Sequence, residues 1–289
     1  MNCLKAENCS STDGKPAQET PWALDRLPPF PWVATRLMQM YAAPDVSISE
    51  IGRVIAQEPV FAARVLQTAN SPLFAVRAQV KSLSHAIILL GLNRVRAITI
   101  TRALGDFVAP ILKIQALRAC WQNGLAAAIL SEKLARACKM DPDFAYLGGL
   151  MRDIGRLALL VKYPEAYANL LAVSQENSYD LLATEHDLFD IDHCQAGAWI
   201  VGELAFPAEL REVIAWHHET LDPHPFRVVH LVHIADLMAD ALGFSVVKPG
   251  PPQSYQDAHE LLPPAARDRF AMDPDALAAE IESRIQAWQ

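Results

Sequence analysis

The chain has 289 residues, of which 52% are hydrophobic and 20% are charged, and its formal net charge at pH 7 is −8. Its length can support one large domain or two ordinary ones with a sizeable core, and its composition excludes a disordered chain. The acidic balance argues against nucleic acid as the main partner, because binding to phosphates needs concentrated Lys and Arg, although Arg94, Arg96 and Arg102 could form a local basic patch.

The N-terminal part begins with a segment that has no periodic pattern. Residues 1–24 are polar, which predicts a flexible lead-in, and Leu27–Pro31 is expected to be rigid and extended. From about residue 32 the pattern is helical almost throughout. Ser47 and Glu50 have the spacing of a capping box at the start of one helix, and Pro59 fits the first turn of the next.

Two further helices are expected before the middle of the chain. Ser84 is predicted to cap the first, Gly91 to end it, and the second to run to about Leu104. Apolar residues then recur at helical spacing around Trp121, which predicts a longer helix that ends near Cys138.

The C-terminal half continues the same pattern. Asp141 and Pro142 suit an N-cap followed by Pro, at the start of the helix that carries Arg152 and Asp153. Pro207 is expected to begin a helix that ends near His217 and His218, and residues 228–242 form an apolar helix that Gly243 could end. Asp273 and Pro274 begin a last short helix. No convincing run of alternating strands appears, so the chain is predicted to be all-α.

The cysteines and the apolar runs bear on the compartment. The five cysteines are odd in number and include no Cys-x-x-Cys pair, which disfavours a zinc knuckle or a disulfide framework and favours a reducing cytoplasm. No apolar run reaches the roughly 18 residues of a membrane-spanning helix, and the first residues lack the pattern of a secretory signal. We therefore expect a cytoplasmic protein without a membrane partner.

The most informative segment is Gly148–Arg156, which contains Arg152 beside Asp153. An adjacent His-Asp pair can bind divalent cations when further His and Asp residues fold beside it. Here the first position is Arg152, whose guanidinium cannot be deprotonated and cannot ligate a metal. Ligand-capable residues follow on later predicted helices, at His193, His217, His218 and Asp236.

The order His-Asp, His, His, Asp on successive helices resembles the HD superfamily of metal-dependent phosphohydrolases. The upstream half is more specific: Glu58-Pro59, residues 64–74 (RVLQTANSPLF) and residues 84–96 (SHAIILLGLNRVR) resemble the HDOD family, the HD-related output domain. The resemblance covers about residues 24–245. It implies an all-α fold in two helical subdomains, 25–112 and an HD-like 113–245, with 1–24 as a lead-in and 246–289 as a Pro-rich connection and C-terminal helix.

The resemblance also places the ligand positions. Asn123 matches the first His ligand and Arg152 the His of the His-Asp pair, so two imidazoles are replaced. Asp153, His193, one of His217 and His218, and Asp236 keep ligand-capable side chains. A guanidinium at residue 152 would repel a divalent cation by several kcal/mol even at an effective dielectric constant of about 20. It is instead expected to pair with Asp153, Asp236 or Asp192.

Structural interpretations compete with ligation at each position. A salt bridge or a helix-terminus contact is favoured over metal ligation for Asp153. For His193, capping or hydrogen bonding at the start of the following helix is favoured over ligation. His217 and His218 are adjacent, so on a helix they point about 100° apart and only one should face the pocket. Asp236 lies on an apolar helix, where a buried carboxylate needs a partner, and Arg152 is the natural one. His233, three residues earlier, could join them.

The leading functional hypothesis is a non-catalytic regulatory domain of bacterial signal transduction that acts through contacts with signalling proteins in trans, such as those of a two-component system. It has no catalytic residues, and no metal or other cofactor is expected. The alternative is a metal-dependent phosphohydrolase or cyclic-nucleotide phosphodiesterase with an atypical ligand set, Asp153, His193, His217 and Asp236. A third hypothesis is a nucleotide sensor in which Arg152 contacts a phosphate.

Overall fold

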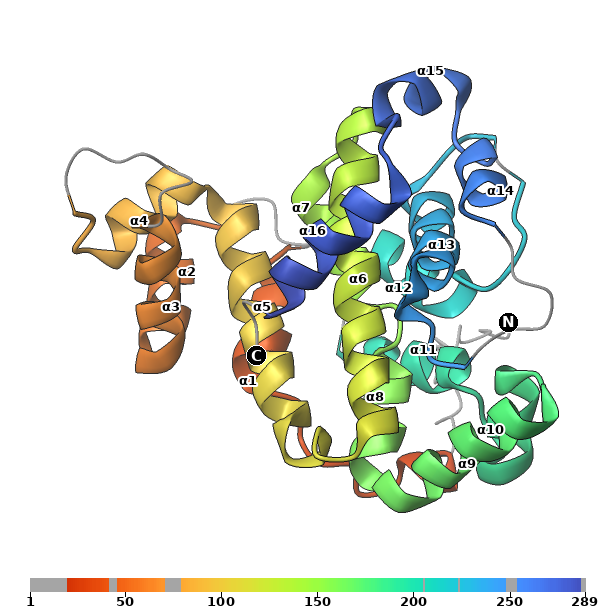
Figure 1. Cartoon of the computed structure of the whole chain (residues 1–289). Helices are drawn as coiled ribbons and strands as arrows, with labels where there is room; N and C mark the ends of the chain where they lie inside the picture. Colours follow the sequence, from red (N-terminus) through yellow and green to blue (C-terminus); the bar gives the residue numbers. More distant parts are fainter. Residues whose placement is uncertain are drawn as a thin grey trace, which may run out of the picture.

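The protein is all-α, as predicted. The computed structural model describes residues 20–41, 46–70, 79–204, 206–222, 224–247 and 254–286, and within these ranges every regular element is a helix (Figure 1). One continuous apolar core runs through both halves of the described chain. Its helices fall into an N-terminal group, a group around one long central helix, and a C-terminal set.

Five helices form the N-terminal group, which lies on the left in Figure 1. They pack mainly on one another, and α5 also contacts α7 of the next group. The predicted boundary after residue 112 falls between this group and the central helix, although the division into two subdomains remains a prediction. The helices are α1 (Trp32–Tyr41), α2 (Ile48–Ala56), α3 (Pro59–Ala69), α4 (Leu83–Leu90) and α5 (Leu92–Val108).

The second group surrounds α6 (Gln115–Cys138), which has 24 residues and a length of about 36 Å. Helices α7 and α13 pack along it, and α8, α11 and α12 form the side where the candidate site lies. The helices that follow α6 are α7 (Pro142–Met151), α8 (Ile154–Lys162), α9 (Pro164–Asn177), α10 (Leu181–Phe189), α11 (His193–Glu203), α12 (Ala208–Trp216) and α13 (Val228–Ala239).

Two predicted segment descriptions need correction. The lead-in ends before residue 24, because the 3₁₀ turn η1 (Trp22–Leu24) buries Ala23 and Leu24; residues 1–19 lie outside the described part of the chain. The C-terminal region also holds more than one helix. It contains α14 (Tyr255–Glu260), α15 (Pro264–Arg267), η5 (Asp268–Phe270) and α16 (Pro274–Gln286). Two short elements lie earlier in the chain: η3 (Ala109–Ile111) follows α5, and the π-turn η4 (Asp240–Phe244) follows α13.

Most predicted helix caps are observed. Ser47 and Glu50 form a reciprocal capping box, and the Asp141 carboxylate accepts two backbone N–H groups at the start of α7. Ser84 was the wrong cap, because Ser82 accepts the backbone N–H of His85 and Ser84 lies inside α4. The prediction chose the later of two serines with similar spacing, and which one takes the extended cap conformation depends on where the preceding chain enters.

Three glycines bring helices into close contact near the site. A Cβ on Gly149 would lie 2.7 Å from the carbonyl oxygen of Ala127, so α7 and α6 can approach only because residue 149 lacks a side chain. A Cβ on Gly155 would lie 2.1 Å from the carbonyl oxygen of His193, and one on Gly197 would lie 2.6 Å from Cγ2 of Ile214. Gly155 therefore lets α8 lie against the backbone of α11, and Gly197 lets α11 lie against the Ile214 side chain of α12.

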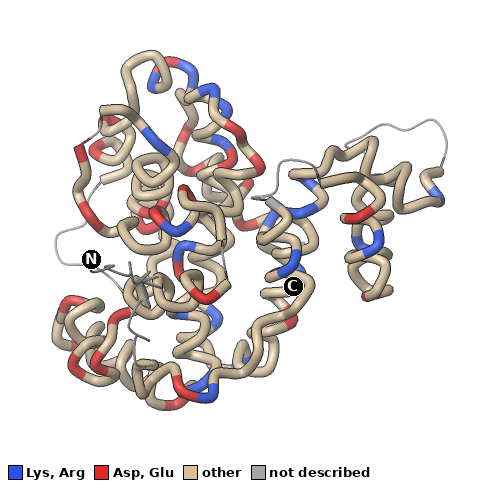
Figure 2. The backbone as a smooth tube through the Cα atoms, turned by 180° about the vertical axis from the view of Figure 1, so that it is seen from behind, with Lys and Arg blue, Asp and Glu red and all other residues tan. Residues whose placement is uncertain are grey.

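The three arginines that could have formed a basic patch each have an acceptor within the protein. Arg94 pairs with Glu132 at 3.0 Å, and Arg102 pairs with Asp106 at 2.6 Å. Arg96 is buried and donates to the carbonyl oxygen of Met40. Figure 2 shows Lys and Arg interspersed with Asp and Glu along the chain.

The described helices do not include one that could cross a membrane by itself. No single helix is both long and apolar enough, whereas Leu83–Leu90 and Leu92–Ile111 meet the length and composition criteria only as a pair, with a bend of 111° between them.

Candidate functional site

The site is centred on a break between two helices. Helix α7 ends at Met151, Arg152 is its C-cap, and Asp153 precedes the first residue of α8. The sequence had predicted that both residues lie within one helix. In the structure the pair lies instead at the junction between α7 and α8. Arg152 is only 1% exposed and Asp153 only 4% exposed. Burial of two opposite charges requires partners for both, and the neighbouring helices supply them.

Arg152 is held by acceptors on three sides. Its Nη2 lies 2.6 Å from Asp236 Oδ1 on α13 and 3.1 Å from Asp153 Oδ2, and it donates to the side-chain oxygen of Asn123 on α6. Its Nη1 donates to the carbonyl oxygen of Gly149 at 2.9 Å. The structure therefore pairs Arg152 with Asp153 and Asp236, whereas Asp192 is used elsewhere, as the N-cap of α11.

Asp153 lies between positively charged or protonatable groups. Arg152 and Arg156 approach its Oδ2 at 3.1 and 3.3 Å, while His193 and His217 approach its Oδ1 at 3.2 and 3.5 Å. Burial opposes ionisation, but the two guanidinium groups outweigh it and hold the pKa of Asp153 well below its usual range. None of these contacts has hydrogen-bond geometry at the two oxygens.

His193 is fixed by a buried carboxylate that the sequence did not identify. Its Nδ1 lies 2.6 Å from Glu185 Oε2 on α10, and Tyr167 on α9 donates to the same carboxylate. Arg156 Nη2 lies 3.2 Å from His193 Nε2. Burial and Arg156 disfavour protonation, but the Glu185 carboxylate prevails and raises the pKa of His193 to about 10. Asp192 is the cap of α11, and His193, its first residue, has the other role expected of it: a buried hydrogen bond at the start of the helix.

The two adjacent histidines both face the cluster, which corrects the expectation that only one would. Helix α12 ends at Trp216, so His217 is its C-cap and His218 lies beyond the helix, where the 100° rule no longer applies. Their ring centroids are 4.2 Å apart, and His218 Nε2 lies 3.1 Å from His193 Nε2. His233 Nδ1 donates to the His217 carbonyl oxygen, which joins α13 to this turn.

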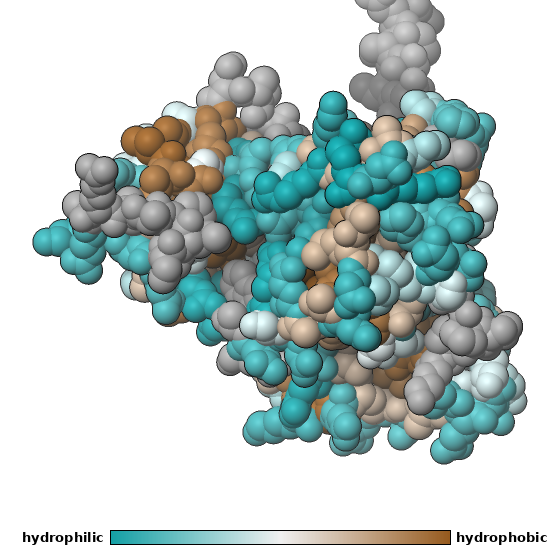
Figure 3. All heavy atoms as spheres, turned by 45° about the horizontal axis from the view of Figure 1, so that its top comes forward, coloured by the Kyte–Doolittle hydropathy of each residue, from teal (hydrophilic) through white to brown (hydrophobic). Residues whose placement is uncertain are grey.

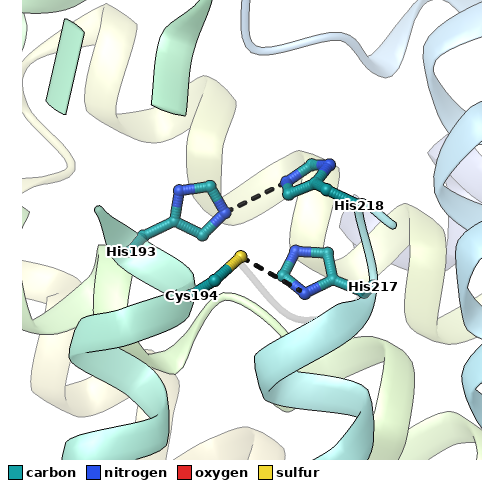
Figure 4. Close-up of side chains that lie close together, drawn as sticks. All are labelled: His193, Cys194, His217 and His218. Carbon is teal, nitrogen blue, oxygen red and sulfur yellow. Dashed lines mark hydrogen bonds between the residues drawn. The ribbon is translucent and has the colours of Figure 1, made fainter. Parts of the chain in front are cut away.

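Cys194 is a further member of the cluster and was not among the predicted site residues. Its Sγ lies 3.9 Å from His217 Nδ1, and the side chain is 9% exposed. Figure 4 shows that His193 and Cys194 project from the start of α11 toward His217 and His218. Burial opposes the thiolate, but His193 outweighs it and lowers the pKa of Cys194 to about 7.

A cavity of about 350 Å³ adjoins this cluster. Asn123, Arg156 and His218 line it, together with Asp236 and Asp240. Asp240 accepts from Asn123 at 3.4 Å, and burial together with the nearby Asp236 raises its pKa to about 7. The seven predicted pocket residues thus lie in one contiguous region, in which His218 is exposed and the other six, Asn123, Arg152, Asp153, His193, His217 and Asp236, are buried.

These residues do not fit the metal position implied by the HD resemblance. A cation bound between Asp153 and Asp236 would have to take the place of Arg152 Nη2, which contacts a carboxylate oxygen of each. Asn123, at the other replaced position, is the acceptor of the same guanidinium. The Asp153–Asp236 position is therefore filled by the chain itself.

Sequence reasoning missed Arg156, Glu185, Tyr167, Cys194 and Asp240. Arg156 follows Asp153 by three residues, a spacing that places two side chains on one helical face, and Cys194 is adjacent to a predicted site residue, so local signals existed for both. Tyr167, Glu185 and Asp240 carry no local signal, because their contacts depend on how α9, α10 and the turn after α13 pack.

The fold agrees with the comparison against known families. The profile of the HDOD domain matches residues 27–220. The chain belongs to the HDOD family. A curated relative, an uncharacterized protein of Treponema pallidum (strain Nichols), is 22% identical over 205 residues, which cover 69% of this chain but 39% of that protein. The chain thus spans about two fifths of the length of this relative.

Solved structures share the fold. An HDOD domain protein of unknown function from Geobacter sulfurreducens has a TM-score of 0.66, 24% identity and 91% coverage of each chain. A protein provisionally named a phosphohydrolase, from Shewanella amazonensis SB2B, has a TM-score of 0.60 and 21% identity over 91% of this chain and 94% of that one. A provisional signal transduction protein from Marinobacter aquaeolei VT8 has a TM-score of 0.59 and 21% identity over 91% and 57%.

Proposed function

We propose that the protein is a non-catalytic regulatory domain of bacterial signal transduction that acts through contacts with other signalling proteins. The observation that carries the proposal is the position of Arg152. Its guanidinium neutralises Asp153 and Asp236 from inside the protein, where a hydrolase of the HD type would need a bound cation to activate water and polarise a phosphate.

Exposed apolar side chains favour a role in protein contacts. Ile88 on α4 is 66% exposed and Val60 on α3 is 58% exposed. Figure 3 shows hydrophobic side chains gathered at the end of the molecule where α4 lies. Apolar residues gathered on one exposed surface are typical of a site that binds a partner.

The main competing function is a metal-dependent phosphohydrolase, and the histidine cluster beside Asp153 is the observation in its favour. The test is turnover. The natural chain is incubated with Mn²⁺, Mg²⁺, Fe²⁺ or Zn²⁺ and with cyclic mononucleotides, cyclic dinucleotides and a chromogenic phosphodiester. We expect no hydrolysis above that of the Asp153→Ala variant. Metal-dependent turnover that Asp153→Ala abolishes would overturn the regulatory proposal.

Arg152→His provides a second test, because it restores the His-Asp pair. The regulatory proposal expects no activity in the natural chain for this substitution to modify. If Arg152→His merely changes the rate of a hydrolysis that the natural protein already performs, the protein is an enzyme.

The geometry does not favour the nucleotide-sensor hypothesis in the form in which Arg152 contacts a phosphate. Arg152 is 1% exposed, and both Nη atoms already donate to protein acceptors. Heat released on titrating nucleotides into the natural chain but not into Arg152→Met would revive it.

A further inference from the structure

We propose that His193, Cys194, His217 and His218 form a binding site for one thiophilic divalent ion, for which Zn²⁺ is the best match. This donor set differs from the Asp153–Asp236 position that Arg152 fills, and it includes a cysteine. One ligand atom from each of the four residues can be chosen so that all lie within 4.8 Å of one another. The inference does not depend on the proposed regulatory function.

The separations are those of a tetrahedral site before small side-chain adjustments. Bond lengths of about 2.0–2.1 Å to nitrogen and about 2.3 Å to sulfur imply nitrogen–nitrogen separations of about 3.3 Å and nitrogen–sulfur separations of about 3.6 Å. The Nε2 atoms of His193 and His218 are 3.1 Å apart, and Cys194 Sγ lies 3.9 Å from His217 Nδ1. In Figure 4 the four side chains surround a common centre.

An outer contact orients the imidazole of His193. His193 Nδ1 is engaged by Glu185 at 2.6 Å, which leaves Nε2 to face the cluster. A carboxylate behind a ligating histidine is the usual second-layer arrangement of zinc sites, because it fixes the ring and increases the basicity of the ligand. His217 Nδ1, the nitrogen nearest Cys194 Sγ, also lies 3.2 Å from the carbonyl oxygen of Val213, so ligation through Nδ1 requires the ring to turn away from that oxygen. Its Nε2 lies 3.5 Å from Asp153 Oδ1.

The backbone holds the two halves of the site together. His193 and Cys194 belong to the first turn of α11, and His217 and His218 follow the last turn of α12. These two helices touch where Gly197 meets Ile214, a contact that would leave no room for a Cβ. The donors are therefore positioned by helix packing rather than by a loose loop, as a preorganised site requires.

The donor chemistry selects the ion. A thiolate with imidazoles favours Zn²⁺ and similar soft or borderline ions over Mg²⁺, Ca²⁺ and Mn²⁺, which prefer oxygen. Four protein ligands complete a tetrahedral shell and leave no open position for substrate, so the site is structural or sensory and not hydrolytic. The guanidinium of Arg156 lies close by and disfavours a cation, whereas Asp153 and Glu185, both in contact with His193, favour one.

The test uses the full-length chain, first treated with a chelator and then titrated with Zn²⁺, with Mg²⁺ in parallel. We expect one Zn²⁺ per chain, no Mg²⁺, and a thiolate-to-metal charge-transfer absorption when Co²⁺ replaces Zn²⁺. Cys194→Ser should abolish that absorption and weaken Zn²⁺ binding by about 100-fold or more. The matched control is Cys138→Ser, since Cys138 is a partly buried free cysteine outside the cluster.

Two results would overturn the site: a natural chain that takes up no Zn²⁺, or Co²⁺ bound with no sulfur charge transfer in both the natural chain and Cys194→Ser. If Cys194→Ser does not fold, X-ray absorption of the zinc-loaded natural chain decides between sulfur ligation and a shell of nitrogen and oxygen only. Hydrolysis is measured separately from Zn²⁺ binding. Zn²⁺ bound without hydrolysis supports both the metal site and the regulatory function. Hydrolysis would overturn the regulatory function, and the binding data alone would still decide whether the metal site exists.

Discussion

Replacing Arg152 with Met should strongly destabilise the fold. The substitution removes the cation but keeps a flexible side chain of comparable length, so it isolates the charge from the loss of packing. At an effective dielectric constant of about 20, the contacts at 2.6 Å with Asp236 and 3.1 Å with Asp153 correspond to about 6 and about 5 kcal/mol of Coulomb attraction. Desolvation of the three ions offsets most of this attraction. The expected net loss on breaking such a buried pair is about 3–5 kcal/mol.

The assay is urea unfolding followed by far-ultraviolet circular dichroism at pH 7 and fixed ionic strength. The double variant Arg152→Met/Asp236→Asn should recover about 1–3 kcal/mol relative to Arg152→Met, because one uncompensated buried charge has been removed. Arg102→Met is the matched control: its pair with Asp106 is 37% and 43% exposed, so the change should be within about 1 kcal/mol. A loss below about 1 kcal/mol for Arg152→Met would show that the guanidinium does not neutralise the buried carboxylates.

Three further predictions concern stability. Burial of Glu132 opposes its ionisation, but Arg94 and Arg284 outweigh this and lower its pKa from 4.5 to about 2, so its contribution is complete above about pH 4.5 and is lost as the pH falls towards 2. This amounts to about 3 kcal/mol, and Glu132→Gln should flatten the acid limb of stability measured by urea unfolding between pH 5 and pH 2. Gly155→Ala should unfold the protein or lower its stability by more than about 3 kcal/mol, because the added Cβ would lie 2.1 Å from a backbone oxygen. Gly124→Ala is the control: a Cβ there would have no atom within 4 Å, so the substitution should stabilise α6 by up to about 1 kcal/mol. Equal melting temperatures for the two variants would contradict the close contact of α8 and α11. Ser82→Ala should lower the free energy of unfolding by about 1 kcal/mol, and Ser84→Ala should change it very little. If thermal unfolding shows the reverse order, Ser84 and not Ser82 caps α4.

The sequence predicted the pairing at the centre of the site because that pairing follows from a local rule. Asp236 lies on an apolar helix, so its carboxylate needs a buried partner. Arg152 was the available cation, because it stands at the position that matches the His ligand of a His-Asp pair. The caps at Ser47 and Asp141 were predicted for a similar reason, since each is decided within four residues.

The features of the site that the sequence did not predict depend on contacts between different helices or on the residue at which a helix ends. Glu185 meets His193 across the turn that joins α10 to α11, where its carboxylate contacts both the backbone N–H and Nδ1 of His193. His217 and His218 both face the cluster because α12 ends one residue before them; had it continued for one more turn, the two rings would have diverged. A boundary error of one residue is ordinary for sequence reasoning, and here it decides the number of imidazoles in the site.

The cation at Arg152 also differs from a dissolved ion in how it is supplied. A metal held by two carboxylates equilibrates with the solution, so its occupancy varies with the concentration of that metal and with any chelator present. A guanidinium tethered at the end of α7 has a concentration at the site that is set by the chain itself. The neutralisation of Asp153 and Asp236 by Arg152 is therefore established when the protein folds, and it does not depend on how much metal the cell contains.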